Sequence, residues 1–262
     1  MTSAALSMLP AWSEPVSTLH DSVRRLIAEA KASVEDYPPL CVLLQEAKYD
    51  FGDITHWPCD FCTIYDADAP IALGSLSAAR DVVNQPSIRV VLSFCPDEMR
   101  RIRGQPTKGW LAHFQDHGLV HYSWPMQDVQ TSYVGKQESC AELAEEWLQI
   151  WFDMCCKVEA LKMSEKMKGA PFGILFHCFG GINRSAAALC AWLIFKYDLQ
   201  PLEAVEVLLR ARPSLDPWKR RDHVCWALQH WFEQRSVLRA RVQAQVASPD
   251  DLKSGSRCDD QT

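Results

Sequence analysis

The sequence predicts an α/β protein in which helices flank a central, mostly parallel twisted sheet. Short runs of apolar or β-branched residues alternate along the chain with segments whose apolar residues recur every three or four positions. The run at 88–94, Ile-Arg-Val-Val-Leu-Ser-Phe, is almost continuously apolar, which is typical of a strand buried on both faces of a sheet. Strands that alternate with helices in this way indicate a layered α/β fold.

Before residue 70 the patterns are weak. The segment 18–34 predicts an amphipathic helix, because its apolar residues share one face: Leu19, Val23, Leu26, Ile27 and Ala30. The short apolar run at 41–44 predicts an edge strand. The stretch at 49–68 is aromatic and broken by proline, so no element is assigned to it.

From residue 70 onward the pattern is regular. Strands are predicted at 71–73, 88–94, 119–124 and 173–176. Helices are predicted at 75–84, where Ser75 or Ser77 can cap the first turn, and at 109–117, 138–168, 184–197, 201–211 and 218–241. The helix at 138–168 has apolar residues at three- and four-residue spacing, and Pro201 suits the first position of its helix.

These elements divide the chain into three parts. We expect a tail and a helix at 1–39, a single catalytic domain at 40–240 and a flexible, polar tail at 241–262. Apolar residues make up 48% of the 262 residues and charged residues 23%, a balance that can bury a globular core.

Charge and targeting signals narrow the choice of partners and compartment. A net charge of −6 gives no reason to expect a nucleic acid or an anionic membrane as partner. Residues 1–12 lack the basic and apolar regions of a secretory signal, and the most apolar run, 186–195, is far shorter than a membrane span. We therefore expect a cytoplasmic or nuclear protein; the sequence gives no indication of its oligomeric state.

The cysteines also favour a reducing compartment. The chain has 11 cysteines, an odd number without the spacing of a disulfide framework, so most are expected to be reduced and buried. His56, Cys59 and Cys62 have a spacing compatible with metal ligation, but no second pair of ligands follows. We expect neither a metal nor an organic cofactor.

One segment combines the residue types that phosphate binding requires. A predicted strand leads into His177-Cys178-Phe179-Gly180-Gly181-Ile182-Asn183-Arg184-Ser185, and the last two residues open a predicted helix. Glycines allow backbone N–H groups to approach a phosphate closely, and the helix N-terminus adds free donors and partial positive charge. A planar guanidinium can hold two phosphate oxygens. The same positive field favours the thiolate form of a cysteine, and a neighbouring hydroxyl can assist that sulfur as a leaving group.

This segment resembles the H-C-x5-R-[S/T] loop of the protein tyrosine phosphatase superfamily. Ile71-Ala72-Leu73-Gly74-Ser75 and Arg212-Pro213 resemble features of its dual-specificity branch, of the atypical kind, and the resemblance covers about residues 70–235. It implies a metal-independent phosphatase that uses Cys178 as nucleophile and Ser185 as an assisting hydroxyl. Arg184 and residues 179–183 (Phe179, Gly180, Gly181, Ile182 and Asn183) would bind the phosphate, and His177 would support the loop.

The resemblance also implies a general acid on a loop after a strand, upstream of the nucleophile. Asp128, in Trp124-Pro125-Met126-Gln127-Asp128, fits this position better than Asp116 or Asp153. The alternative is that Asp128 only caps the next turn. Some relatives carry a second cysteine near the nucleophile, and Cys95 is the candidate for such a redox partner.

The substrate is less well defined. The five loop residues between Cys178 and Arg184 include no lysine or arginine, which favours a singly phosphorylated group such as phosphotyrosine or phosphoserine/threonine in a protein. The Gly-x-Asn-Arg ending also resembles RNA 5′-triphosphatases, which form the second hypothesis together with other non-protein phosphatases of the superfamily. A catalytically silent module that binds phosphorylated partners is the third.

Overall fold

The computed structural model describes residues 61–65, 70–101, 106, 109–128, 137–164, 172–212, 215 and 222–247. The helix predicted at 18–34 and the edge strand predicted at 41–44 lie outside these residues. None of the helices within the described ranges combines the length and the apolar character that crossing a membrane would require.

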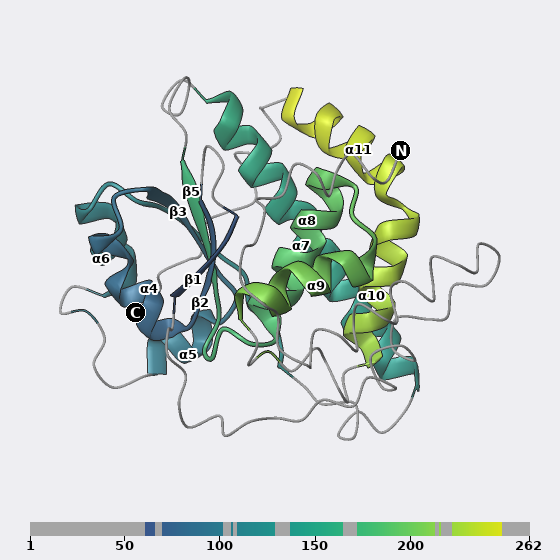
Figure 1. Ribbon diagram of the computed structural model, residues 1–262, viewed down its shortest axis with the longest axis horizontal. Helices are drawn as coiled ribbons and strands as arrows, with labels where there is room; N and C mark the ends of the chain where they lie inside the picture. Colours follow the sequence, from purple (N-terminus) through teal and green to yellow (C-terminus); the bar gives the residue numbers. More distant parts are fainter. Residues whose placement is uncertain are drawn as a thin grey trace.

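A five-stranded sheet in the order β1-β2-β5-β3-β4 forms the centre of the molecule (Figure 1). β2 (Ile71–Gly74), β5 (Gly173–His177), β3 (Ile88–Ser93) and β4 (Val120–Ser123) are parallel to one another. β1 (Phe61–Tyr65) pairs antiparallel with β2 at the edge. The predicted α/β class with a mostly parallel sheet is therefore confirmed, and β1 is a strand that the sequence pattern did not predict.

β5 is the central strand of the sheet, and the loop that contains Cys178 begins at its end. β5 lies between β2 and β3, and its last residue, His177, is in register with Gly74 on one side and Ser93 on the other. Every residue of β5 is buried. Because the carboxyl ends of parallel strands meet at one edge of a sheet, the residues that follow β2, β3 and β5 come together there.

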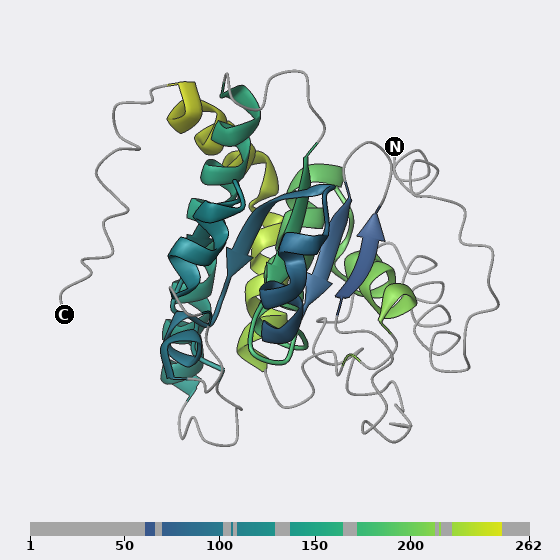
Figure 2. The same cartoon turned by 90° about the vertical axis from the view of Figure 1, so that its left-hand side faces the viewer.

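Helices cover both faces of this sheet (Figures 1 and 2). α4 (Leu76–Asp81), followed by the 3-10 turn η1 (Val82–Asn84), and α6 (Trp110–Asp116) lie on one face. The other face is covered by α8 (Arg184–Tyr197) and α9 (Pro201–Ala211), with α7 (Gln137–Met163), α10 (Asp222–Glu233) and α11 (Arg235–Ala247) beyond them. All α8 residues up to Phe195 are buried, as expected for a helix between a sheet and an outer helical layer.

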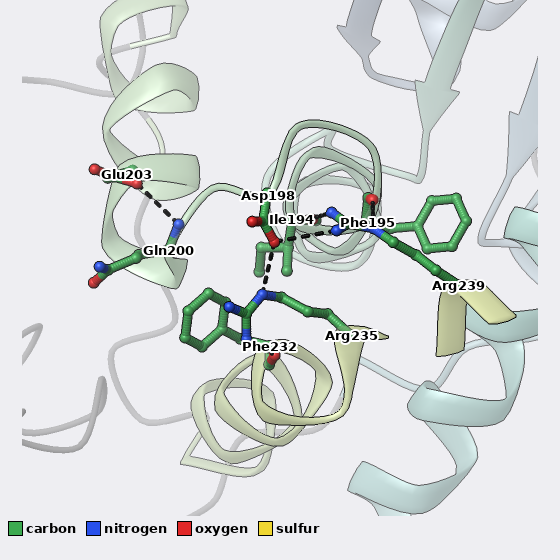
Figure 3. Close-up of polar contacts among 8 residues, drawn as sticks. All are labelled: Ile194, Phe195, Asp198, Gln200, Glu203, Phe232, Arg235 and Arg239. Carbon is green, nitrogen blue, oxygen red and sulfur yellow. Dashed lines mark hydrogen bonds and ion pairs between the residues drawn. The ribbon is translucent and has the colours of Figure 1, made fainter. Parts of the chain in front are cut away.

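The C-terminal end of α8 is fixed by two arginines of α11 (Figure 3). Nε of Arg239 donates to the carbonyl of Phe195 at 2.7 Å and Nη2 to that of Ile194 at 3.2 Å. The carbonyl of Ile194 also accepts from the N–H of Asp198 at 3.1 Å, so both carbonyls in the last turn of α8 are satisfied. Nε of Arg235 donates to Oδ1 of Asp198, the C-cap residue, at 2.7 Å. Positive charge at a helix C-terminus is favourable, and it anchors α8 at the end opposite the loop.

Three predicted helices differ from the structure by more than one residue, and one helix was not predicted. The helix predicted at 138–168 is α7, which ends at Met163. The helix predicted at 218–241 is two helices separated at Gln234, and α11 continues to Ala247. The helix predicted at 75–84 changes to 3-10 geometry after Asp81. α5 (Pro96–Arg101) was not predicted, although Pro96 at its start, with acidic residues in its first turn, is a helix signal.

Candidate active site

The loop connects β5 to α8 and brings a thiol to a helix N-terminus. Cys178 follows β5 directly and is 2% exposed, and α8 begins six residues later at Arg184. Oγ of Ser185, in the first turn of α8, donates to Sγ of Cys178 at 3.2 Å. The structure therefore brings three predicted residues together: Cys178, Arg184 and Ser185.

Gly181 is required by the path of the loop. Its φ of +66° is in the left-handed region, and a Cβ at this position would lie 2.5 Å from the carbonyl oxygen of Gly74. The loop thus rests on the turn between β2 and α4, where the N–H of Leu76 also donates to the carbonyl of Phe179 at 3.1 Å. Gly180 has no positive φ; its carbonyl accepts from Nη2 of Arg212 at 3.3 Å.

The loop leaves backbone donors available. In the part of the chain that the structure describes, the N–H groups of residues 179–182 donate to no protein acceptor. Buried or half-buried backbone donors without a partner are uncommon in folded proteins. Next to the N-terminus of α8, they are suited to an anion.

Arg184 is held by one nitrogen and leaves the other two available. Its side chain is almost completely buried, and Nη1 donates to Oε1 of Glu98 at 2.6 Å and to the carbonyl of Met126 at 3.2 Å. Nε is buried, and among the described residues neither it nor Nη2 has a hydrogen-bond partner. Nε and Nη2 form one edge of the guanidinium, the edge that can bind two oxygens of one ligand.

The electrostatic environment keeps Arg184 charged. Burial by itself would lower the pKa of Arg184, but the charge of Cys178 and the hydrogen bond and charge of Glu98 outweigh it, so the pKa is raised. Glu98 was not predicted as a site residue. Its position in the first turn of α5, directly after the strand β3, is the only signal in the sequence that could have pointed to it.

Asp128 lies beside the loop, at the end of a segment with several anchors. Nδ2 of Asn183 lies 3.3 Å from Oδ2 of Asp128 and 3.5 Å from Oδ1. Upstream, the N–H of Trp124 donates to the carbonyl of Ser93 at 2.9 Å, and its Nε1 donates to Asp153 at 2.8 Å. Asp128 is exposed, whereas the carboxylate of Asp153 is engaged by the indole. Of the three aspartates considered, Asp128 is the one in contact with the loop.

His177 belongs to a buried polar cluster. Oγ of Ser93 contacts Nε2 of His177 and lies 2.7 Å from Nε2 of His121 on β4. Burial lowers the pKa of His177 to about 3, with a smaller contribution from His121, and burial lowers the pKa of His121 to about 4. Both imidazoles are therefore neutral near pH 7. Ser93 and His121 were not predicted, because they lie on other strands and contact His177 only in the folded sheet.

Cys95 lies in the same region as Cys178. It follows β3, where the N–H of the preceding Phe94 donates to the carbonyl of His177 at 3.0 Å. Burial raises the pKa of Cys95 well above its usual value; the nearby charge of Cys178 raises it further, and Arg184 opposes the shift. Both cysteines are buried and reduced.

The remaining predicted residues have simpler surroundings. Phe179 is 53% exposed, and Ile182 packs against the core from a partly buried position. Within the described ranges, no group of three or more His, Cys, Asp or Glu side chains could hold a metal ion. His56 and Cys59 lie outside those ranges, and the side chain of Cys62 is not described.

The chain resembles known proteins to different extents. No protein-family model matches it. The curated mouse (Mus musculus) protein cyclin-dependent kinase inhibitor 3 is 30% identical over 101 residues. This match covers 38% of the present chain and 38% of that relative, so the chain spans about two fifths of its length.

Solved structures match a larger share of the chain. The Yvh1 phosphatase domain from Chaetomium thermophilum has a TM-score of 0.47 at 16% identity, covering 66% of this chain and 96% of that one. PTPMT1 in complex with PI(5)P has a TM-score of 0.46 at 16% identity, covering 68% and 98%. Human DUSP28 has a TM-score of 0.44 at 17% identity, covering 68% and 97%. Each of these similarities is one of fold.

Proposed function

We propose that this chain is a cysteine-dependent phosphatase of the protein tyrosine phosphatase superfamily that hydrolyses phosphate monoesters through a phosphocysteine intermediate. One observation carries the proposal. The buried Arg184 is fixed through Nη1, while Nε and Nη2 have no partner within the described chain, at the helix N-terminus where Cys178 also lies. A tetrahedral dianion bound there would satisfy the free edge of Arg184 and the loop N–H groups together.

In the first step, Sγ of Cys178 attacks phosphorus and the bond between phosphorus and the ester oxygen breaks. The guanidinium of Arg184 and the loop N–H groups bind the non-bridging oxygens, whose charge must be balanced in the transition state. Asp128 gives a proton to the departing oxygen, so that an alcohol or a phenol leaves instead of its anion. Its place beside Asn183 supports this role.

In the second step, water attacks phosphorus and the bond between phosphorus and sulfur breaks. Asp128, now ionised, takes a proton from the attacking water. Oγ of Ser185, 3.2 Å from the sulfur, donates a hydrogen bond to the departing thiolate. Inorganic phosphate is released, and the protein returns to its starting state with a thiolate at Cys178 and a protonated Asp128.

Glu98 serves as a positioning residue in this scheme. Its carboxylate and the carbonyl of Met126 share one nitrogen of Arg184, which directs the opposite edge of the guanidinium toward the ligand. An ion pair to a buried arginine also avoids an uncompensated charge before the substrate binds.

The substrate class that we propose is a singly phosphorylated protein side chain, phosphotyrosine or phosphoserine/threonine. The loop offers one guanidinium and backbone donors, and no lysine or second arginine that could hold a further phosphate. The Gly-x-Asn-Arg ending keeps an RNA 5′-triphosphatase as the second candidate.

The test compares the wild-type protein with Cys178→Ser on four substrates: an aryl phosphate, phosphopeptides, triphosphorylated RNA and phosphoinositides. A chelator is present throughout, because the proposed chemistry needs no metal. Cys190→Ala, which alters a buried cysteine within α8, outside the loop, is the control. We expect hydrolysis of the aryl phosphate and the phosphopeptides by the wild type and the control, and none by Cys178→Ser. Activity confined to triphosphorylated RNA would contradict the proposed substrate class and favour an RNA 5′-triphosphatase. Phosphopeptide binding without turnover would indicate an interaction module.

A further inference from the structure

Ser93 connects two imidazoles from neighbouring strands at the base of the loop. Ser93 on β3 is completely buried, pairs with His177 on β5 and contacts Nε2 of that ring. On the other side its hydroxyl lies 2.7 Å from Nε2 of His121 on β4. His121 pairs with Val91, two residues before Ser93, so it lies on the same face of the sheet and reaches Ser93 diagonally.

The number of protons in this cluster couples the two rings. Because both imidazoles are neutral near pH 7, each carries a single N–H group. The hydroxyl of Ser93 has one proton and can donate to only one ring. The other ring must therefore donate to the oxygen of Ser93, and the tautomer of one histidine dictates that of the other.

The surroundings of the two rings favour one direction of hydrogen-bond donation, from His121 through Ser93 to His177. Nδ1 of His177 is buried and lacks a well-formed hydrogen bond within the described chain, and the adjoining backbone of Cys178 favours a proton on this ring. His121 is partly buried, and its Nδ1 is not among the buried atoms that lack a partner. In this direction, Nε2 of His121 donates to Oγ of Ser93, and the hydroxyl of Ser93 donates to Nε2 of His177. Nε2 of His177 then carries no proton, so the proton of this ring is on Nδ1, next to Cys178.

The plane of the His121 ring is fixed from outside the sheet. Its centroid lies 4.6 Å from that of Phe114 on α6, and Phe114 is completely buried. His121 is therefore held in one orientation by a helix that does not contribute to the loop.

We propose that His121 and Ser93 are positioning residues, which fix the tautomer and the ring plane of His177 and thereby the backbone at Cys178. The effect on turnover rests on the proposed phosphatase function. The tautomer of His177 does not depend on that function, so the positioning role and the phosphatase function can be tested separately.

The first measurement is the ring nitrogen spectrum of His177 at pH 7, by two-dimensional NMR of the ¹⁵N-labelled protein. We expect a single tautomer with the proton on Nδ1 in the wild type, and a mixture of both tautomers in His121→Phe and in Ser93→Ala. His121→Gln, whose side-chain amide can donate from a similar position, should restore the single tautomer. His113→Phe is the matched control, because His113 lies in the adjacent aromatic group of α6 and its ring nitrogen Nε2 contacts the carbonyl of Arg80 rather than the Ser93 cluster.

The second measurement is the steady-state hydrolysis of an aryl phosphate by the same variants. Small displacements of catalytic groups lower rates strongly, so we expect His121→Phe to lower kcat about tenfold, with KM changed less than about twofold. His121→Gln should recover most of this loss. The double variant with Ser93→Ala should be no slower than the slower single variant, because both substitutions interrupt the same chain.

The outcomes separate the two proposals. If His177 keeps one tautomer in both His121→Phe and Ser93→Ala, the positioning role is wrong, even when kcat falls. If the tautomer changes in the folded variants but the wild type hydrolyses no phosphate ester, the positioning of His177 stands and the proposed function fails. Should His121→Phe not fold, as judged by circular dichroism, Ser93→Ala gives the same readout with a smaller change in volume.

Discussion

Oγ of Ser185 donates a hydrogen bond to Sγ of Cys178 across 3.2 Å, and both residues are almost completely buried. In the proposed second step, this contact would stabilise the negative charge that develops on the sulfur as the bond between phosphorus and sulfur breaks. We therefore expect Ser185→Ala to slow the second step more than the first, so that phosphocysteine accumulates and kcat falls at least about tenfold. A burst of the leaving group in rapid-quench kinetics, with phosphate found on Cys178 by mass spectrometry, checks this. Ser185→Thr keeps the hydroxyl and should show no burst; a burst of equal size in both variants would contradict the role.

Asp128 should matter in proportion to the basicity of the leaving group. Without a proton donor, Asp128→Asn is expected to hydrolyse an alkyl or simple aryl phosphate about 10² to 10³ times more slowly than the wild type. An ester with a strongly acidic phenol should be nearly unaffected, because its anion leaves without protonation. Asp116→Asn is the control, and equal losses with both leaving groups would assign the acid to another residue.

Gly181 should tolerate no side chain. Alanine there meets both an unfavourable φ of +66° and the backbone of Gly74 at 2.5 Å, which cannot move without displacing β2. We expect Gly181→Ala to reduce the free energy of unfolding by about 2 kcal/mol or more and to abolish turnover. Gly118→Ala separates the two causes, because Gly118 has a φ of +70° but no atom within 4 Å of the added Cβ. Urea unfolding of both variants is the measurement, and equal destabilisation would show that the contact with Gly74 is unimportant.

The buried histidines should make the folded protein sensitive to acid. Burial lowers the pKa of His177 to about 3 and of His121 to about 4, from 6.5 for an unperturbed histidine. Below pH 6.5 the unfolded chain binds protons that the folded protein does not bind. The stability contributed by these groups is therefore complete above pH 6.5 and is lost as the pH falls toward 4 and then 3. Each histidine should contribute a slope of about 1 kcal/mol per pH unit once the unfolded chain is protonated.

Urea unfolding between pH 7 and pH 5 tests this slope. The loss of stability per pH unit should be smaller in His121→Phe, which lacks one of the two groups, than in the control His113→Phe. A wild-type stability that stays constant down to pH 5 would contradict the buried, neutral state of both rings.

Cys95 remains the predicted redox partner of Cys178, the proposed nucleophile. Peroxide would convert the thiolate of Cys178 to a sulfenic acid, and attack by the sulfur of Cys95 would form a disulfide and release water. Because burial raises the pKa of Cys95, we expect this second reaction to be slow near neutral pH and faster in mild alkali. Peptide mapping should find a link between Cys95 and Cys178, and Cys95→Ser should instead accumulate the sulfinic acid at Cys178. Identical over-oxidation of the wild type would end the prediction.

Local patterns were sufficient for most elements after residue 70. The bounds of α8 and α9 agree with the prediction, because Pro201 marks one helix start and an uninterrupted apolar pattern defines the other helix. β1 was missed since it pairs with a single neighbour, β2, and its segment contains no long apolar run. The break at Gln234 was missed because α10 and α11 both continue the same helical periodicity.

The sequence by itself determined the residues whose relation is local. Cys178, Arg184 and Ser185 lie within eight positions of one another, so a strand, a glycine turn and a helix start are sufficient to bring them together. Only the tertiary structure decided their partners. Glu98 is 86 positions from Arg184, and Ser93 is 84 positions from His177. Such contacts depend on which strands become neighbours in the sheet, and strand order is set by the packing of the whole domain rather than by any short pattern.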